Sequence, residues 1–262
     1  MILREARQDR FRVGKAYLSC TSIADAKCRI SQAIEEGLNT YICVSNPRTV
    51  TYATNHKDYQ EVMERSFMNL PDAEPMKWAA RLWGLKDVER TMGPVLFHEM
   101  LSDPESGIQH FLLGDTDETL EKITKKLKGE ANANISGSFS PPFCKLDEYD
   151  YEGIAKIIND SGASVVWISM RAPKQDFFST RILPYLDKKV CIGVGAAFRF
   201  CLGEYKMAPP IIKKLGLMGL YWGKKNQSWP AFIWGYLKDN VPYVFYLAAI
   251  PFRRLFGKKY YE

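Results

Sequence analysis

The sequence predicts an α/β protein built around a mostly parallel, doubly wound sheet. Short apolar runs alternate along the chain with amphipathic segments of roughly ten to fifteen residues, which is the pattern of βαβ units. The 262 residues are 46% hydrophobic and 25% charged, a composition typical of globular proteins rather than of disordered or collagen-like chains. No apolar run approaches the roughly 18–20 residues of a membrane-spanning helix, which excludes a multi-span membrane protein.

The expected strands are the apolar runs, and the expected helices are the segments with apolar residues at helical spacing. Strands are expected at residues 40–45, 109–114, 133–138, 164–169 and 190–194. Helices are expected at residues 57–66, 76–83, 118–128, 149–161 and 173–186. The helix at 118–128 has the clearest signals, because acidic residues occupy its first turn, lysines fill its last turn and Gly129 follows it.

Charge divides the chain into two parts. Residues 1–204 carry 26 Lys or Arg against 28 Asp or Glu, whereas residues 205–262 carry 10 against 2. We therefore expect an α/β domain at 1–204, followed by a basic, aromatic-rich C-terminal appendage at 205–262.

The six cysteines form no CxxC pair and lack zinc-site spacing, and several lie inside apolar runs. The first residues are charged and lack the apolar core of a secretory signal. Both features favour a reducing, cytoplasmic location.

In a sheet of this kind, ligands bind at the carboxyl ends of the strands, so the loops after the expected strands form the candidate site. Residues 193–198 (GVGAAF) contain glycines that let backbone N–H groups approach a ligand ahead of an expected helix, which suits a phosphate or diphosphate. A tight turn between strand and helix explains the same residues equally well. The chain has no GxGxxG at its start, no Walker motif and no GxSxG.

A bound metal is not expected. The triplet Asp115-Thr116-Asp117 resembles a DxD metal motif, but it immediately precedes a helix, where Asp and Thr serve as cap and first-turn residues. The three histidines are scattered along the chain and share no ligand spacing.

Several blocks of the sequence, taken in order, resemble the WecG/TagA/CpsF family of bacterial glycosyltransferases over roughly residues 30–222. They are SNPRTVTYA, LPDAEPMKWAARLWG, FLLGDTDETLEKI, SGASVVWISMRAPKQDFF, VCIGVGAAFRFCLGEYKMAPP and KLGLMGLYW. The resemblance implies a Rossmann-like α/β fold and an inverting enzyme that needs no metal or other cofactor. It also implies transfer of N-acetylmannosamine or a related sugar from a UDP-sugar to a polyprenyl-diphosphate-linked acceptor, at the cytoplasmic membrane face. The products of such enzymes feed teichoic acid, enterobacterial common antigen, capsule or exopolysaccharide.

The resemblance assigns roles to particular residues. Asp72 stands where the family has its proposed general base, the group that removes the proton of the attacking hydroxyl. Ser45 and Asn46 match a turn beside the active site. The residues expected to bind the donor are Gly114, Lys174, Gln175, Gly193, Gly195, Ala196 and Arg199.

The chain also departs from the family pattern. Arg199 replaces an acid, Met218 replaces a glutamate, and Ala73 replaces a glycine after Asp72. Arg199 could pair with a diphosphate or a uronate. An alternative function is therefore a non-catalytic, membrane-associated paralogue that binds a nucleotide sugar or a lipid-linked glycan without transfer.

The C-terminal part predicts attachment to an anionic membrane surface. The uncharged residues 240–252 would rise only about 20 Å as a helix, too short to span a bilayer, and Pro242 and Pro251 are expected to break it. Aromatic residues suit the headgroup boundary. The cations expected to bind the membrane or the acceptor diphosphate are Arg253, Arg254, Lys258 and Lys259.

The alternative is that this tail packs on its own domain or on a second subunit of a homo-oligomer. Nucleic acid is not an expected partner, because no known nucleic-acid-binding module is present.

Overall fold

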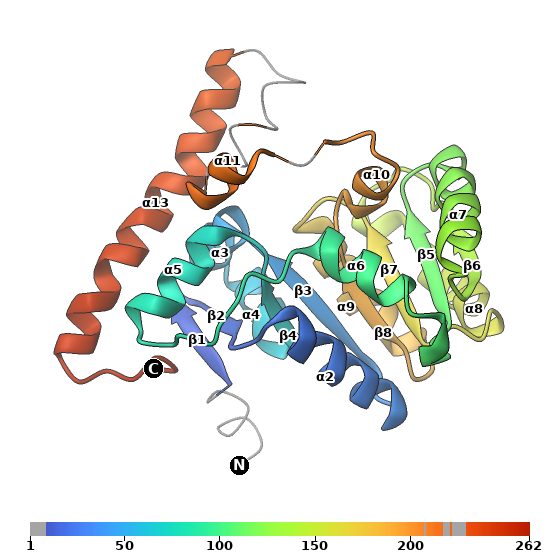
Figure 1. Cartoon of the computed structure of the whole chain (residues 1–262), viewed down its shortest axis with the longest axis horizontal. Coiled ribbons are helices and arrows are strands. Elements are labelled where there is room, and N and C mark those ends of the chain that lie inside the picture. Colours follow the sequence, from blue (N-terminus) through green and yellow to red (C-terminus); the bar gives the residue numbers. More distant parts are fainter. Residues whose placement is uncertain (1–8, 207, 217–220, 222–228) are drawn as a thin grey trace.

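The computed structural model describes residues 9–206, 208–216, 221 and 229–262. Its centre is a six-stranded sheet in the order β4-β3-β8-β7-β5-β6, with every neighbouring pair parallel. Helices cover both faces of this sheet, and a separate antiparallel hairpin of β1 and β2 lies beside its β4 edge (Figure 1). The predicted doubly wound α/β fold is therefore confirmed.

The strands are β1 Arg10–Val13, β2 Ala16–Ser19, β3 Thr40–Ser45, β4 Met68–Pro71, β5 His110–Gly114, β6 Ile135–Phe139, β7 Val165–Ser169 and β8 Val190–Gly193. The α-helices are α2 Ile23–Glu35, α3 Pro47–Asn55, α4 Lys57–Arg65, α5 Glu74–Leu82, α6 Gly93–Leu101, α7 Asp117–Ala131, α8 Tyr151–Asp160, α9 Lys174–Ile182, α10 Ala197–Cys201, α11 Pro210–Lys214 and α13 Trp229–Leu255. Short 3-10 turns are η1 Pro104–Ser106, η2 Leu146–Glu148 and η3 Leu183–Tyr185.

Alternate residues of each strand point to opposite faces of the sheet and so feed two separate cores. In β3, for example, Cys43 packs into the core shared with α3, α4, α5, α8 and α9, whereas Ile42 packs into the core shared with α2, α6 and α7. The second core contains the fully buried Trp167, whose ring meets that of Phe97 edge-on at 5.2 Å. Such an aromatic pair contributes about 0.5–1.5 kcal/mol beyond the area it buries.

Each strand and helix expected from sequence is present, with ends shifted by a few residues, except that residues 173–186 divide into α9 and the turn η3. The missed elements include the hairpin and β4. The buried Asn69 interrupts the apolar run by which β4 could have been predicted from sequence. Its side-chain amide donates to the carbonyls of Tyr17 (2.8 Å) and Met63 (2.7 Å), and these hydrogen bonds join the hairpin to the sheet.

The expectation that Pro242 and Pro251 break the C-terminal helix is wrong. The helix α13 runs through both prolines for 27 residues. An internal proline costs about 3 kcal/mol, and packing on the body of the protein offsets this cost. Tyr243 and Ile250 are each 2% exposed, and the Tyr243 hydroxyl donates to the Pro75 carbonyl at 3.0 Å.

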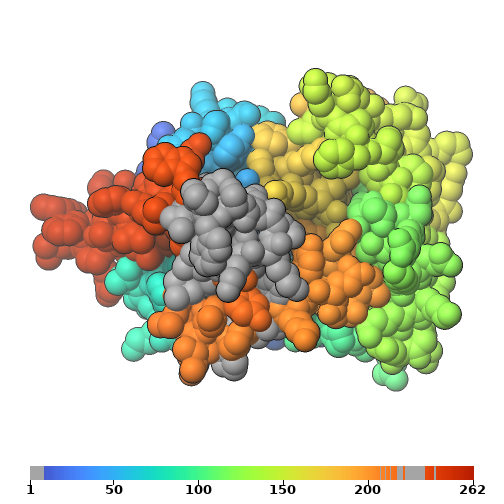
Figure 2. Space-filling view, turned by 90° about the horizontal axis from the view of Figure 1, so that it is seen from above, coloured from blue at the N-terminus to red at the C-terminus, as the bar shows by residue number. Residues whose placement is uncertain are grey.

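One face of α13 therefore packs on α3 and α5, as Figure 1 shows along the outer side of the molecule. The chain end is held as well, since the Arg12 amide donates to the Tyr260 carbonyl at 2.7 Å. Figure 2, seen from the side on which the strands end, shows α13 extending beyond the α/β body. The boundary at residue 204 stays a prediction. Among the described helices, none has the length and apolar character needed to cross a bilayer.

Candidate active site

A cavity of about 710 Å³ lies across the carboxyl ends of the parallel strands. The residues that line it come from the loops after β3, β4, β5, β7 and β8 and from the segments that follow them. They are Val44, Asn46, Arg48, Thr49, Asp72, Met92, Pro94, Asp115, Ser169, Met170, Arg171, Ala172, Gln175, Val194, Gly195, Ala196, Arg199, Phe200 and Tyr205. This volume is in the range of pockets that enclose a small-molecule ligand or cofactor.

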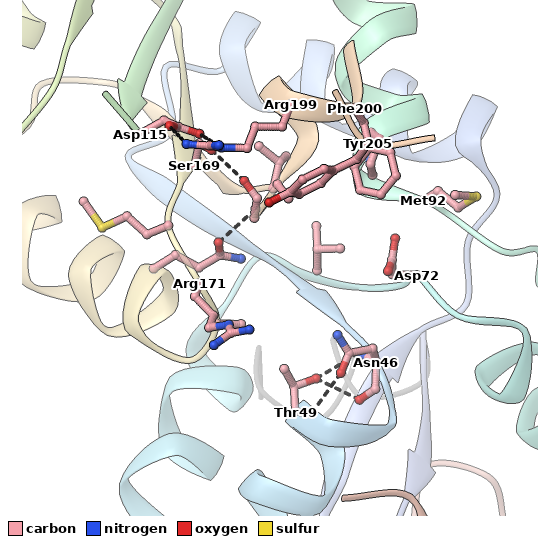
Figure 3. Close-up of a pocket in the computed structure, with 18 of the residues that line it drawn as sticks. Asn46, Thr49, Asp72, Met92, Asp115, Ser169, Arg171, Arg199, Phe200 and Tyr205 are labelled. Carbon is pink, nitrogen blue, oxygen red and sulfur yellow. Dashed lines mark hydrogen bonds and ion pairs between the residues drawn. The ribbon is translucent and has the colours of Figure 1, made fainter. Parts of the chain in front are cut away.

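Figure 3 shows the labelled residues around the opening. Asp115 and Arg199 lie on one side, Asn46 and Thr49 lie opposite, and Asp72 and Arg171 stand on the two flanks between them. Polar groups from distant parts of the chain thus converge on one space, as expected where parallel strands end together.

Asp72 is fixed at the end of β4 by its backbone and its side chain. Its amide donates to the Ser45 carbonyl at 2.9 Å, and its own carbonyl accepts from Arg90 Nε at 2.6 Å. The carboxylate Oδ1 accepts from the amide of Gly93, the first residue of α6, at 2.9 Å. Burial raises the pKa of Asp72, and the Gly93 hydrogen bond and the Arg90 charge oppose that rise without cancelling it. A carboxylate in these surroundings is suited to accept a proton.

Asn46 lines the cavity and begins helix α3. Its Oδ1 accepts from the Thr49 amide at 3.2 Å, and Thr49 Oγ1 accepts from the Asn46 amide at 2.9 Å. The nitrogen of the Asn46 side-chain amide is on the cavity side (Figure 3). Ser45, expected beside the active site, does not line the cavity: its side chain is 1% exposed, and its Oγ has no hydrogen-bond partner among the described residues.

The loop after β7 holds the turn after β8 in place. Gln175, only 2% exposed, accepts at Oε1 from the Gly195 amide (2.9 Å), and Ser169 Oγ donates to the Gly195 carbonyl at 2.6 Å. The Gly195 amide, expected to meet the donor, is therefore occupied by Gln175. Gly193 lies outside the cavity lining, and a Cβ there would lie 2.7 Å from Gln175 Nε2. Gly193 thus makes room for Gln175, while Gly195 and Ala196 border the cavity.

Lys174 does not enter the cavity. Its ammonium donates to the Cys144 carbonyl at 2.5 Å and lies over the rings of Phe143 and Tyr149, at 4.9 and 5.0 Å from their centroids. This arrangement does not favour the contact that was expected between Lys174 and a phosphate of the donor.

Gly114 also lies outside the lining and has a structural role. Its φ is +105°, and a Cβ would lie 2.7 Å from the Ser169 carbonyl oxygen.

We expect Gly114→Ala to lower the free energy of unfolding by about 1–3 kcal/mol or more, because alanine adds backbone strain and a close contact. The matched control is Gly129→Ala in α7, where nothing lies within 4 Å and helix propensity predicts a gain of up to about 1 kcal/mol. Urea unfolding measures both, and a Gly114→Ala protein as stable as wild type would contradict the prediction.

Arg199 is paired within the protein. Its Nε and Nη2 donate to the two carboxylate oxygens of Asp115 at 2.9 and 2.7 Å, and its Nη1 lies 3.6 Å from a Glu204 oxygen. Burial raises the pKa of Asp115, but the hydrogen bonds and charge of Arg199 outweigh burial and leave the pKa below its ordinary value. Arg199, which stands where the family pattern has an acid, is thus paired with the acidic side chain of Asp115.

The capping interpretation of Asp115-Thr116-Asp117 is confirmed for its last two residues. Thr116 is the N-cap of α7, accepting from the Thr119 amide at 3.2 Å, and Asp117 is in the first turn. Asp115, with a φ of 59°, faces the cavity instead. Within the described ranges, no cluster of three or more His, Cys, Asp or Glu side chains is arranged to hold a metal ion.

The C-terminal cations lie away from the cavity. Arg253 and Arg254 are in the last turn of α13, at the end of the helix remote from the carboxyl ends of the strands (Figure 1). Arg254 donates to the Leu82 carbonyl at 3.3 Å, and Lys258 lies 4.0 Å from Glu262. Lys259 is near the Tyr261 ring. The structure thus brings none of these four to the candidate active site, and Met218 lies outside the described residues.

Sequence reasoning missed several lining residues, including Arg48, Arg171 and Tyr205. Arg171 had a usable signal, because it follows β7 in the MRAPKQD loop and the carboxyl ends of strands were already the place to look. Tyr205 had none, since it follows the short helix α10 in a segment without a periodic pattern.

A polar cavity across the carboxyl ends of a parallel sheet, with the buried carboxylate of Asp72 on one wall and arginines on others, is the usual ligand site of a doubly wound α/β protein. The sequence matches the model of the Glycosyl transferase WecG/TagA/CpsF family over residues 11–255. The chain belongs to this family of glycosyl transferases, so its general role is sugar transfer. The match extends beyond residues 30–222 and includes the β1–β2 hairpin, except Arg10, and all of α13.

Proposed function

We propose that the chain is an inverting glycosyltransferase that moves N-acetylmannosamine or a related hexose from a UDP-sugar to a polyprenyl-diphosphate-linked acceptor. Such a reaction serves the synthesis of bacterial cell-surface polysaccharide. The observation that carries this proposal is Asp72, a carboxylate held by the Gly93 amide at the cavity wall with its pKa raised by burial.

The proposed reaction is a single displacement. The acceptor hydroxyl attacks the anomeric carbon from the side opposite to the leaving UDP, which inverts the configuration. Asp72 accepts the hydroxyl proton as the new bond forms. Asn46 borders the same space and presents an amide nitrogen, a donor suited to a sugar or acceptor oxygen. UDP departs with a negatively charged diphosphate, which requires positive charge nearby.

The proposed site of action is the inner face of the plasma membrane, where a polyprenyl-linked acceptor resides. Its support is the outer face of α13 and the turn that follows it, which carry large apolar side chains at helical spacing. They are Trp234, Leu237, Val241, Val244, Phe245, Phe252, Leu255 and Phe256. Contiguous exposed apolar residues beside basic ones suit a helix that lies in an anionic membrane interface.

We expect purified protein to release UDP when given a UDP-sugar together with a short-chain polyprenyl-diphosphate sugar, and to release little without the acceptor. A panel of UDP-sugars, scored by UDP release and by mass of the product, would identify the donor. EDTA should leave turnover unchanged, because the proposed step depends on Asp72 and on side-chain cations. Donor binding without product from any pair would favour the non-catalytic alternative. Turnover lost with EDTA and restored by Mn²⁺ would contradict the metal-independent reaction.

A further inference from the structure

Arg48, Arg171 and Arg199 line the cavity, and the surroundings of Arg171 and Arg199 give these two different electrostatic roles. Arg199 makes a two-point ion pair with Asp115 and a longer contact with Glu204. With both carboxylates ionised, this group carries a net charge of about −1. A diphosphate placed there would compete with Asp115 for the guanidinium and would meet uncompensated negative charge.

Arg171 is in a different situation. It is exposed at the carboxyl end of β7, and the part of the chain that the structure describes offers no hydrogen-bond or ion-pair partner to its guanidinium. Figure 3 shows its side chain projecting from the loop before α9 toward the side of the cavity that Asn46 and Thr49 form. Its backbone is fixed, because its carbonyl accepts from the Gln175 amide at 3.3 Å, and Gln175 is itself tied to Gly195.

We propose that Arg171 is a cation that binds the diphosphate of the donor, and that Arg199 and Asp115 together form a polar wall for an uncharged part of the donor. This inference rests on the proposed nucleotide-sugar donor and assigns its two ends within the cavity. Arg171 can present paired N–H donors to phosphate oxygens without breaking an internal ion pair. Asp115, already charged and oriented by Arg199, presents an oxygen edge to hydroxyl or N–H groups.

The test compares the affinities of UDP and uridine, because their ratio isolates the diphosphate. Isothermal titration of wild-type protein should show UDP binding much more tightly than uridine. We expect Arg171→Ala to weaken UDP binding by about 10–100-fold and to change uridine binding by less than about threefold. Arg171→Lys should recover part of the loss, because lysine keeps the charge without the paired donors.

The matched comparison removes the other arginine together with its partner, so that the net charge of the cavity does not change. The double variant Asp115→Ala/Arg199→Ala should keep the UDP-to-uridine ratio within about threefold of wild type, while weakening both ligands. Arg181→Ala removes an arginine of α9 that pairs with Asp147 outside the cavity, and it should leave both affinities unchanged. Thermal unfolding of each variant checks that it is folded.

A double variant with a collapsed ratio, beside an Arg171→Ala protein with a normal one, would assign the diphosphate to Arg199 and overturn the inference. Equal ratios in all variants would overturn it as well and leave the proposed donor in place. If wild-type protein binds neither UDP nor uridine, the proposed donor fails, and this assignment fails with it.

Discussion

Replacement of Asp72 by asparagine is expected to lower turnover by about 10²–10⁴-fold, the contribution of a positioned general base. The substitution is nearly isosteric, and the asparagine Oδ1 can still accept the Gly93 hydrogen bond. The cavity should therefore keep its shape, and UDP-sugar affinity should change little. Steady-state turnover and donor titration measure the two effects separately. Asp87→Asn, an exposed carboxylate on the segment between α5 and α6, is the matched control and should be silent.

The pH profile gives an independent readout of the same residue. Asp72 must be ionised to accept a proton, so turnover should fall as pH drops through its pKa, which burial places above the ordinary value of an aspartate. Because that pKa is higher in the folded than in the unfolded protein, ionisation weakens the fold as pH rises through it. Asp72→Asn should therefore melt at the same temperature as wild type or higher at neutral pH. If turnover of the Asp72→Asn protein is within a few-fold of wild type, Asp72 is not the general base.

The sheet could be predicted from sequence because its central strands are local signals. Residues 40–45 and 164–169, for example, are nearly uninterrupted apolar runs, as expected for parallel strands covered on both faces. The hairpin had no such signal, since Arg10 in β1 is a charged residue that is only 9% exposed. Its guanidinium donates to the Met63 carbonyl at 3.2 Å and to the Phe67 carbonyl at 3.1 Å, near the end of α4. A buried arginine satisfied by carbonyls more than fifty residues away is not recognisable from local pattern.

The candidate site shows the same division. Asp72 and Asn46 could be predicted from motifs, and both line the cavity. The ion pair between Asp115 and Arg199 joins residues 84 positions apart, and nothing near either residue predicts the other. The direction of the Lys174 side chain also depends on a distant segment, the carbonyl of Cys144. Side-chain roles that depend on such tertiary partners had to come from the structure.

The structure also changes how membrane attachment must be tested. Deletion of residues 241–262 is the experiment that the sequence suggests, but it would remove Tyr243 and Ile250 from the core. A truncated protein that failed to bind vesicles could simply be unfolded. The exposed face of α13 and the turn that follows it offer substitutions that leave the packed face intact, because Phe245, Phe252 and Phe256 are 68%, 65% and 79% exposed.

Serine at these three positions is expected to lower binding to anionic vesicles by at least about 100-fold. Burial of one phenylalanine side chain contributes about 1.5–3 kcal/mol, so three that insert even partly account for this factor. Sedimentation with vesicles of mixed phosphatidylglycerol and phosphatidylcholine measures the change. The matched control places serine at Phe143, Ile157 and Tyr185, three exposed apolar residues outside α13, and should bind as wild type does.

A second variant separates the charge contribution from the apolar one. Glutamine at Arg253, Lys258 and Lys259 should weaken binding to anionic vesicles by about 1 kcal/mol per cation and leave the weak binding to neutral vesicles unchanged. Arg254 is left in place because it donates to the Leu82 carbonyl. Added salt should weaken binding of wild-type protein more than that of the glutamine variant, since screening acts on the charges that the variant lacks.

Turnover of the serine variant should fall on long-chain polyprenyl acceptors and persist on soluble analogues, because only the former must be reached at a bilayer. If the serine variant sediments with anionic vesicles as strongly as wild type, α13 is not the membrane-binding surface.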